Sequence, residues 1–83
     1  MKTEKSLVEI GLGKEGDVVA IRGGRALCQR LSGMCIRPGT KIRKISKSFL
    51  GGPVTVQIGN ARIALGFRMA TKIIVEVEES ISQ

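Results

Sequence analysis

Residues 54–65, VTVQIGNARIAL, consist of two arms of alternating side chains on either side of Gly59-Asn60. A Gly-Asn pair supplies the positive φ angles that a two-residue hairpin turn needs. This register makes three apolar cross-strand pairs, which are Ile58 with Ala61, Val56 with Ile63, and Val54 with Leu65. The remaining side chains fall on the opposite face, because side chains alternate along a strand. The segment therefore predicts a β-hairpin whose apolar face closes a small core.

Short extended segments flank the hairpin on both sides. Residues 17–22, DVVAIR, are rich in β-branched residues and predict a strand. Residues 41–47, KIRKISK, place Ile42 and Ile45 three positions apart, which interrupts strict alternation and predicts a β-bulge. Residues 72–77, KIIVEV, predict a closing strand.

One helix is expected between the first two strands. Residues 25–34, RALCQRLSGM, place Leu27, Leu31 and Met34 at helical spacing, and the pattern ends near Gly33. The Pro38-Gly39 pair then predicts a turn into the next strand. Short strands, Gly-rich turns and one short amphipathic helix predict a mainly-β fold in which a small sheet curls and closes on itself.

The chain has 83 residues and a net charge of +7. This length predicts a single domain, 1–83, with an ordered core at about 6–77. No Asp or Glu lies between Val18 and Val75, so the middle of the chain is basic and attracts phosphate, anionic lipid or an acidic protein surface. An equally plain interpretation is that the terminal acids fold back against the basic middle. The absence of a secretory apolar segment predicts a cytoplasmic protein.

The residue types needed for catalysis are scarce. The chain has no His, Tyr or Trp, and its acids lie in two terminal zones, so we expect no enzyme activity. No phosphate-binding loop or dinucleotide motif is present, and we expect no cofactor. Cys28 and Cys35 alone make a poor metal site. We expect both to be small buried apolar residues, because free Cys is among the most buried residue types.

Four segments together resemble a known family. In order and spacing, SLVEIGLGKEGDVVAIRGG, LCQRLSGMCIRPGTKI, SFLGGPVTVQIGNARIAL and ATKIIVEV are similar to the FeoA domain of bacterial ferrous iron transport systems. The resemblance implies an SH3-like small barrel and a cytoplasmic accessory protein of the FeoB Fe(II) transporter. It implies action on the transporter's GTP-binding cytoplasmic region, and contact with the membrane through that partner only. The sequence does not predict the oligomeric state.

Two positions depart from the family pattern. The family usually has Gly where Cys35 stands, whereas this chain carries Gly33 two positions earlier. The family also has an apolar residue at the position of Lys44. Both departures concern the corner between the helix and the following strand.

We predict that the partner docks at this corner, because Arg and Met are enriched in interfaces. The predicted site consists of Arg25, Arg30, Met34, Arg37, Pro38 and Gly39. A solvated basic face is the plainer alternative. A nucleic-acid-binding small β-barrel, or a domain related to metal-dependent repressors, is the alternative function, since cations supply phosphate contacts. Nucleic acid is disfavoured by the low aromatic content, with Phe49 and Phe67 as the two rings.

Overall fold

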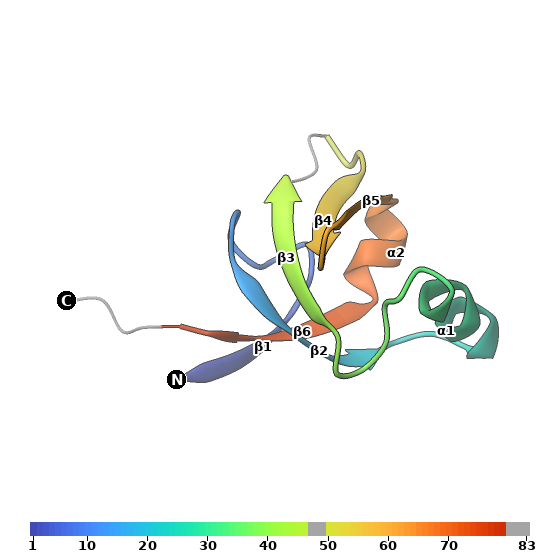
Figure 1. The fold of residues 1–83 in the computed structure, drawn as a ribbon, viewed down its shortest axis with the longest axis horizontal. Coiled ribbons are helices and arrows are strands. Elements are labelled where there is room, and N and C mark those ends of the chain that lie inside the picture. Colours follow the sequence, from blue (N-terminus) through green and yellow to red (C-terminus); the bar gives the residue numbers. More distant parts are fainter. Residues whose placement is uncertain (47–49, 80–83) are drawn as a thin grey trace.

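The computed structural model describes residues 1–46 and 50–79 of the chain. Its elements follow in the order β1 (Lys2–Ser6), β2 (Glu15–Ile21), α1 (Arg25–Ser32), β3 (Lys41–Ser46), β4 (Val54–Ile58), β5 (Ala61–Leu65), α2 (Phe67–Thr71) and β6 (Ile73–Glu78). The strands form one antiparallel sheet in the order β1-β6-β2-β3-β4-β5 (Figure 1). The mainly-β prediction is confirmed.

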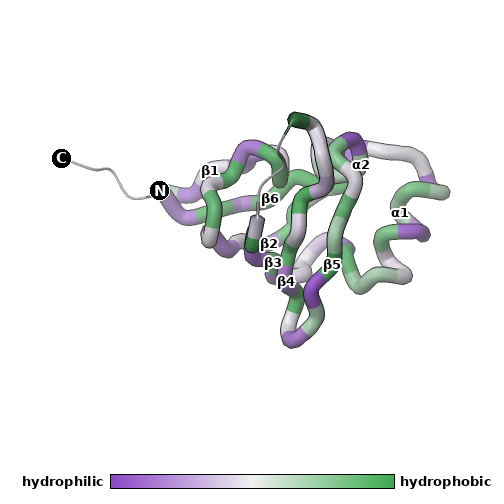
Figure 2. The backbone as a smooth tube through the Cα atoms, turned by 90° about the horizontal axis from the view of Figure 1, so that it is seen from above, coloured by the Kyte–Doolittle hydropathy of each residue, from purple (hydrophilic) through white to green (hydrophobic). Residues whose placement is uncertain are grey.

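The sheet curls around one core, but its ladder does not close. Apolar and hydrophilic positions alternate along the strands, as expected of a sheet with one buried face (Figure 2). β1 and β5 stand at the two ends of the strand order and do not pair with each other within the described residues, so the predicted small barrel curls around its core without a closed hydrogen-bonded ladder. The reason is that β5 leads directly into α2, which lies beside β6 (Figure 1). The buried core consists of Leu7, Ile10, Val18, Leu31, Ile36, Ile42, Val54, Val56, Leu65, Ala70, Ile73, Val75 and Val77.

The hairpin has the predicted register. β4 and β5 pair Val54 with Leu65, Val56 with Ile63 and Ile58 with Ala61. Val54, Val56 and Leu65 are buried, which confirms the apolar face. The turn differs in one respect: Gly59 has φ +59°, whereas Asn60 keeps a negative φ. Positive φ at the first central position is the type II′ pattern, in which Gly takes that place.

The predicted bulge in β3 is confirmed, but Lys44 rather than Ile45 lies in the core with Ile42. The register against β4 shifts between Lys44 and Ser46, which leaves Ile45 as the extra residue. Lys44 stands two positions after Ile42 and lies on the same inner face by simple alternation, and it is only 3% exposed. Ile45 is half-buried.

Two elements were not predicted. β1 pairs along its whole length with β6, and α2 forms one short turn between β5 and β6. Lys47 of the predicted strand, residues 48 and 49 after it, and residues 80–83 lie outside the described residues.

Candidate partner-docking site

The helix α1 packs one side against the barrel and leaves the other side in solvent. Leu31 is completely buried and Leu27 is half-buried, so the predicted apolar stripe faces the core. Arg25 and Arg30 are exposed. The helix begins after Gly24, which is extended and gives no side-chain cap. Packing of the apolar stripe, rather than a side-chain cap, thus holds the first turn of this short helix in place.

The C-terminal end of α1 is capped by two nested backbone hydrogen bonds. The Ile36 N–H donates to the Leu31 carbonyl at 2.8 Å, and the Cys35 N–H donates to the Ser32 carbonyl at 2.9 Å. This pair of bonds is the Schellman motif, which requires a left-handed residue between the helix and the following chain. Cys35 takes that position with φ +67°, whereas Gly33 keeps a right-handed φ of −63°. The structure therefore gives Cys35 the conformation that Gly usually supplies.

A tight turn follows the helix and brings Arg37 back beside it. The Thr40 N–H donates to the Arg37 carbonyl at 3.0 Å, and Gly39 has φ +98°. Pro followed by a left-handed Gly is the sequence of a type II turn, which confirms the predicted turn. The Arg37 Nη1 donates to the Ser32 Oγ at 3.2 Å, so the guanidinium lies against the last turn of α1.

A shallow, mainly apolar cavity of about 350 Å³ lies between α1, the end of β2 and this turn. Its lining consists of Ile21, Arg25, Cys28, Gln29, Ser32, Arg37 and Pro38. Two arginine side chains thus border an apolar floor. An acidic group beside a small apolar side chain would fit both features.

The structure brings together part of the predicted site. Arg25, Arg37 and Pro38 line the cavity, whereas Arg30, Met34 and Gly39 do not. Met34 is half-buried and packs against the core, because the chain turns inward toward Ile36 after the helix. Sequence reasoning missed the contribution of Ile21, Cys28 and Gln29. Their helical spacing places Cys28 and Gln29 beside Arg25, but no sequence signal connects α1 with the end of β2.

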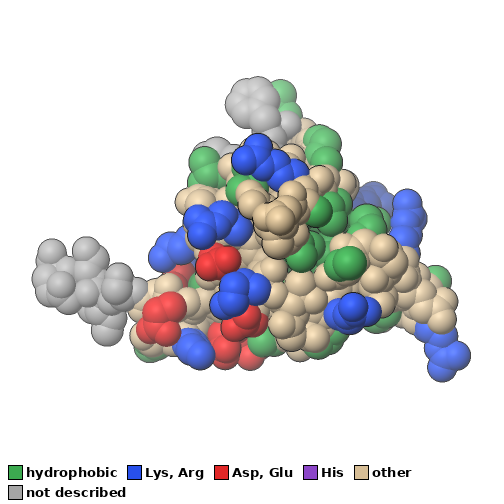
Figure 3. Space-filling model, viewed as in Figure 1, with side chains coloured by type: hydrophobic (Ala, Val, Ile, Leu, Met, Phe, Trp, Pro, Cys, Tyr) green, Lys and Arg blue, Asp and Glu red, His purple; other side chains and the backbone are tan. Residues whose placement is uncertain are grey.

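The acidic side chains of the molecule gather toward one end, where basic side chains lie among them (Figure 3). Figure 3 shows the acidic side chains gathered over the end of the barrel that holds β1 and β6, while isolated basic side chains lie on the α1 side. Lys41 and Arg43 form ion pairs with Asp17 and Glu15, at 3.6 and 3.8 Å. The acids therefore do fold back on part of the basic middle.

The basic residues around α1 take no part in these ion pairs with acidic side chains. Within residues 1–46 and 50–79, the ion pairs involve Met1, Lys5, Lys41 and Arg43, and none involves Arg22, Arg25, Arg30 or Arg37. All four arginines lie in the stretch from Val18 to Val75, which contains no Asp or Glu. The α1 end consequently carries uncompensated positive charge.

The prediction that both cysteines are buried is wrong. Cys35 is exposed and Cys28 is half-buried, and both are free thiols. The left-handed backbone at the helix end turns the chain at Cys35, and this residue contributes backbone geometry rather than core volume. Among the residues that the structure describes, no group of three or more His, Cys, Asp or Glu side chains is placed to hold a metal ion.

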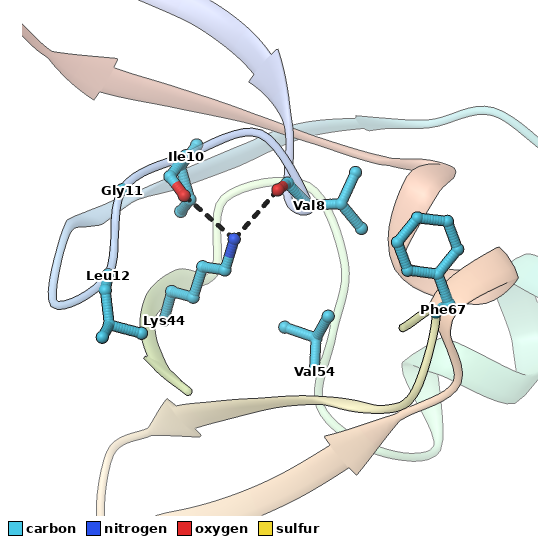
Figure 4. Close-up of a pocket in the computed structure, with 8 residues that line it drawn as sticks. Val8, Ile10, Gly11, Leu12, Lys44, Val54 and Phe67 are labelled. Atoms are coloured by element: carbon cyan, nitrogen blue, oxygen red, sulfur yellow. Dashed lines mark hydrogen bonds between the residues drawn. The ribbon is translucent and has the colours of Figure 1, made fainter. Parts of the chain in front are cut away.

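A second cavity, of about 360 Å³, lies above Lys44 between β3, β4, α2 and the loop before β2 (Figure 4). The Lys44 Nζ donates to the carbonyls of Val8 and Ile10 at 3.0 and 2.9 Å. The backbone of Lys44 also pairs with the same loop, through Gly13 and Lys14. This arrangement fastens the loop to the barrel, so we assign Lys44 a structural role.

No helix in the described part of the chain is long and apolar enough to cross a membrane. The sequence profile of the FeoA domain family matches residues 5–77. No curated protein matches the chain.

Solved structures share the fold. The crystal structure of an iron uptake regulatory protein (FeoA) is 33% identical with a TM-score of 0.81, over 92% of this chain and 99% of that chain. Iron(II) transport protein A from Clostridium thermocellum is 32% identical with a TM-score of 0.78, over 87% of this chain and 44% of that chain.

A manganese-dependent transcriptional repressor has a TM-score of 0.83 at 20% identity, over 94% of this chain and 44% of that chain. That likeness shows the fold alone. The profile match, in contrast, spans both departures noted in the sequence, at Cys35 and Lys44, and runs from β1 into β6. By sequence as well as by fold, this chain belongs to the FeoA domain family.

Proposed function

We propose that this chain is a cytoplasmic accessory protein of bacterial Fe(II) uptake. It acts by binding the GTP-binding cytoplasmic region of a FeoB-type transporter, and it reaches the membrane through that partner. Family membership supports a role in iron uptake, as does the 33% identity to an iron uptake regulatory protein. The chemistry of the described residues favours binding over metal handling, because Fe(II) prefers imidazole and carboxylate ligands and the α1 end offers neither.

The observation that carries the proposal is the cavity between Arg25 and Arg37. A mainly apolar cavity whose lining includes two arginines fits a partner segment in which an acidic side chain stands next to an apolar one. Neither arginine has an acidic partner in the described part of this chain, so both are available for a carboxylate of another protein.

Calorimetry with the purified cytoplasmic region of the transporter tests the proposal. The wild-type chain should bind, and Arg25→Glu with Arg37→Glu should weaken binding at least about tenfold through two like-charge contacts. The matched control is Arg68→Glu with Lys72→Glu, which changes the net charge equally at exposed positions of α2 and its end. The control should stay within about threefold of wild type.

The outcomes separate the possible readings. Equal losses in both variants would mean that net charge, not the cavity, drives binding. No binding by the wild-type chain would refute the choice of partner. Tight binding of a DNA duplex with a steep dependence on salt would instead favour the alternative of a nucleic-acid-binding barrel.

A further inference from the structure

The strand β5 leaves one edge of the sheet unpaired. Within residues 1–46 and 50–79 it is the last strand in the order, and β4 is its one neighbour. In a hairpin with a two-residue loop, the residues that flank the loop are hydrogen-bonded to each other, and bonded and non-bonded pairs then alternate. Ile58 with Ala61 and Val56 with Ile63 are therefore bonded pairs. The backbone N–H and C=O groups of Arg62 and Ala64 point away from β4.

The side chains leave these outward groups accessible. Ala61, Arg62 and Ala64 are exposed, and Ile63 is half-buried. In both Figure 1 and Figure 2, the free edge of β5 is turned toward the side of the molecule on which α1 lies.

The two edges of the sheet differ in their protection. The other edge strand, β1, reads KTEKS and carries three charged side chains in five positions. Charged side chains are the usual means by which proteins prevent strand pairing at an edge. β5 reads ARIAL, with one charged side chain and no proline. β5 thus has little of the protection from pairing that charged side chains and proline usually give an edge strand.

The charge of the chain selects the occupant. A second copy would bring another +7 molecule against this edge, which opposes self-association. Arg62 forms no ion pair with any residue in the described ranges, and no acid lies between Val18 and Val75. An acidic segment of another protein is therefore the complementary partner.

We propose that the β5 edge binds an extended, acidic segment of a partner protein by strand addition. In antiparallel register the segment places a small residue opposite Ala64, an apolar residue opposite Ile63 and an acidic residue opposite Arg62. Its backbone exchanges hydrogen bonds with Arg62 and Ala64, and its carboxylate lies beside the Arg62 guanidinium. This inference depends on the edge alone and does not require the transporter as partner.

Titration of the isotope-labelled chain with a blocked peptide, Thr-Thr-Ala-Val-Glu-Thr-Thr, tests the inference by NMR. We expect saturable shifts at the amides of Arg62 and Ala64, slower exchange of both amide protons, and a dissociation constant of about 1 mM or lower. The same peptide with Lys in place of Glu should bind about three- to fivefold more weakly.

Two variants of the chain complete the test. Ala64→Pro removes an outward N–H without breaking a bond to β4, so it should keep the fold and weaken peptide binding at least about tenfold. Ala64→Val keeps the N–H and should bind as the wild type does.

Three results would overturn the proposal. They are the absence of shifts at millimolar peptide, shifts that lie away from β5, and equal binding of the Glu and Lys peptides. If the amide shifts of Arg62 and Ala64 change with protein concentration in the absence of peptide, the edge pairs with a second copy of the chain and not with an acidic partner.

Discussion

The Leu31 carbonyl accepts a hydrogen bond from the Ile36 N–H at 2.8 Å, and between these two residues Cys35 is held at φ +67°. Residues other than Gly lose about 1–2 kcal/mol in this conformation. Gly adopts this conformation without that loss, but it loses more conformational entropy than Cys when the chain folds. Cys35→Gly should therefore raise the free energy of unfolding by about 0.5–1 kcal/mol, measured by denaturant titration. Gly33→Ala, at a right-handed φ, is the control and should be tolerated. A destabilised Cys35→Gly variant would contradict the assigned helix end.

The hairpin faces can be separated by a pair of substitutions at adjacent positions. Val56 is completely buried, so Val56→Asp should destabilise the fold by about 3 kcal/mol or more by burying an unpaired carboxylate. Thr55 points to the opposite face, and Thr55→Asp should cost less than about 1 kcal/mol. Thermal unfolding followed by circular dichroism compares the two. Equal melting temperatures would show that the faces are wrongly assigned.

The loop before β2 should depend on Lys44. Lys44→Ala removes two side-chain hydrogen bonds and leaves the carbonyls of Val8 and Ile10 without that donor, at a cost of about 2 kcal/mol or more. Lys44→Met restores apolar volume but not the bonds, and should cost about half as much. Amide hydrogen exchange should show that residues 8–14 lose protection in both variants. Unchanged exchange there would mean that the backbone pairs alone hold the loop.

Acidification should loosen the ends of β1 and β6. The Glu79 carboxylate accepts a hydrogen bond from Lys5 Nζ at 2.8 Å, and this bond holds the pKa of Glu79 below its ordinary value of 4.5. A lowered pKa in the folded state stabilises the fold above pH 4.5, and this contribution disappears as the pH falls through the folded-state pKa. Both side chains are partly exposed, so the effect should stay local.

The measurement for this pair is the amide exchange of β1 between pH 5 and pH 3. Protection of β1 should decrease across this interval in the wild-type chain. Glu79→Gln should lower the protection at pH 5 and remove the change with pH. A wild-type response that persists in Glu79→Gln would assign it to another group, such as Glu78, whose carboxylate accepts a hydrogen bond from the terminal ammonium of Met1.

The elements that could be predicted from the sequence are those with a strong local pattern. The hairpin register followed from alternation around Gly59-Asn60, and the helix from the spacing of Leu27 and Leu31. β1 was missed because KTEKS has no apolar alternation: it pairs through its backbone at the sheet edge, where most side chains stay partly exposed. α2 is too short for helical spacing to show.

The site was only partly predictable for a different reason. Arg25 and Arg37 could be named from charge and position, but the cavity between them requires Ile21, which comes from β2. The inward position of Lys44 follows from alternation with Ile42, but the carbonyls that accept its hydrogen bonds come from a distant loop. Such contacts depend on how elements far apart in the sequence meet.

The position of β6 has a consequence for synthesis of the protein. β6 follows the other five described strands in the sequence, yet it lies between β1 and β2 and supplies Ile73, Val75 and Val77 to the core. β1 therefore has no strand partner until β6 has been synthesised, whereas β2 to β5 form a meander of neighbouring strands that can assemble earlier. Because contacts between distant segments form late, the nascent chain must keep part of its apolar core surface in solution until β6 inserts.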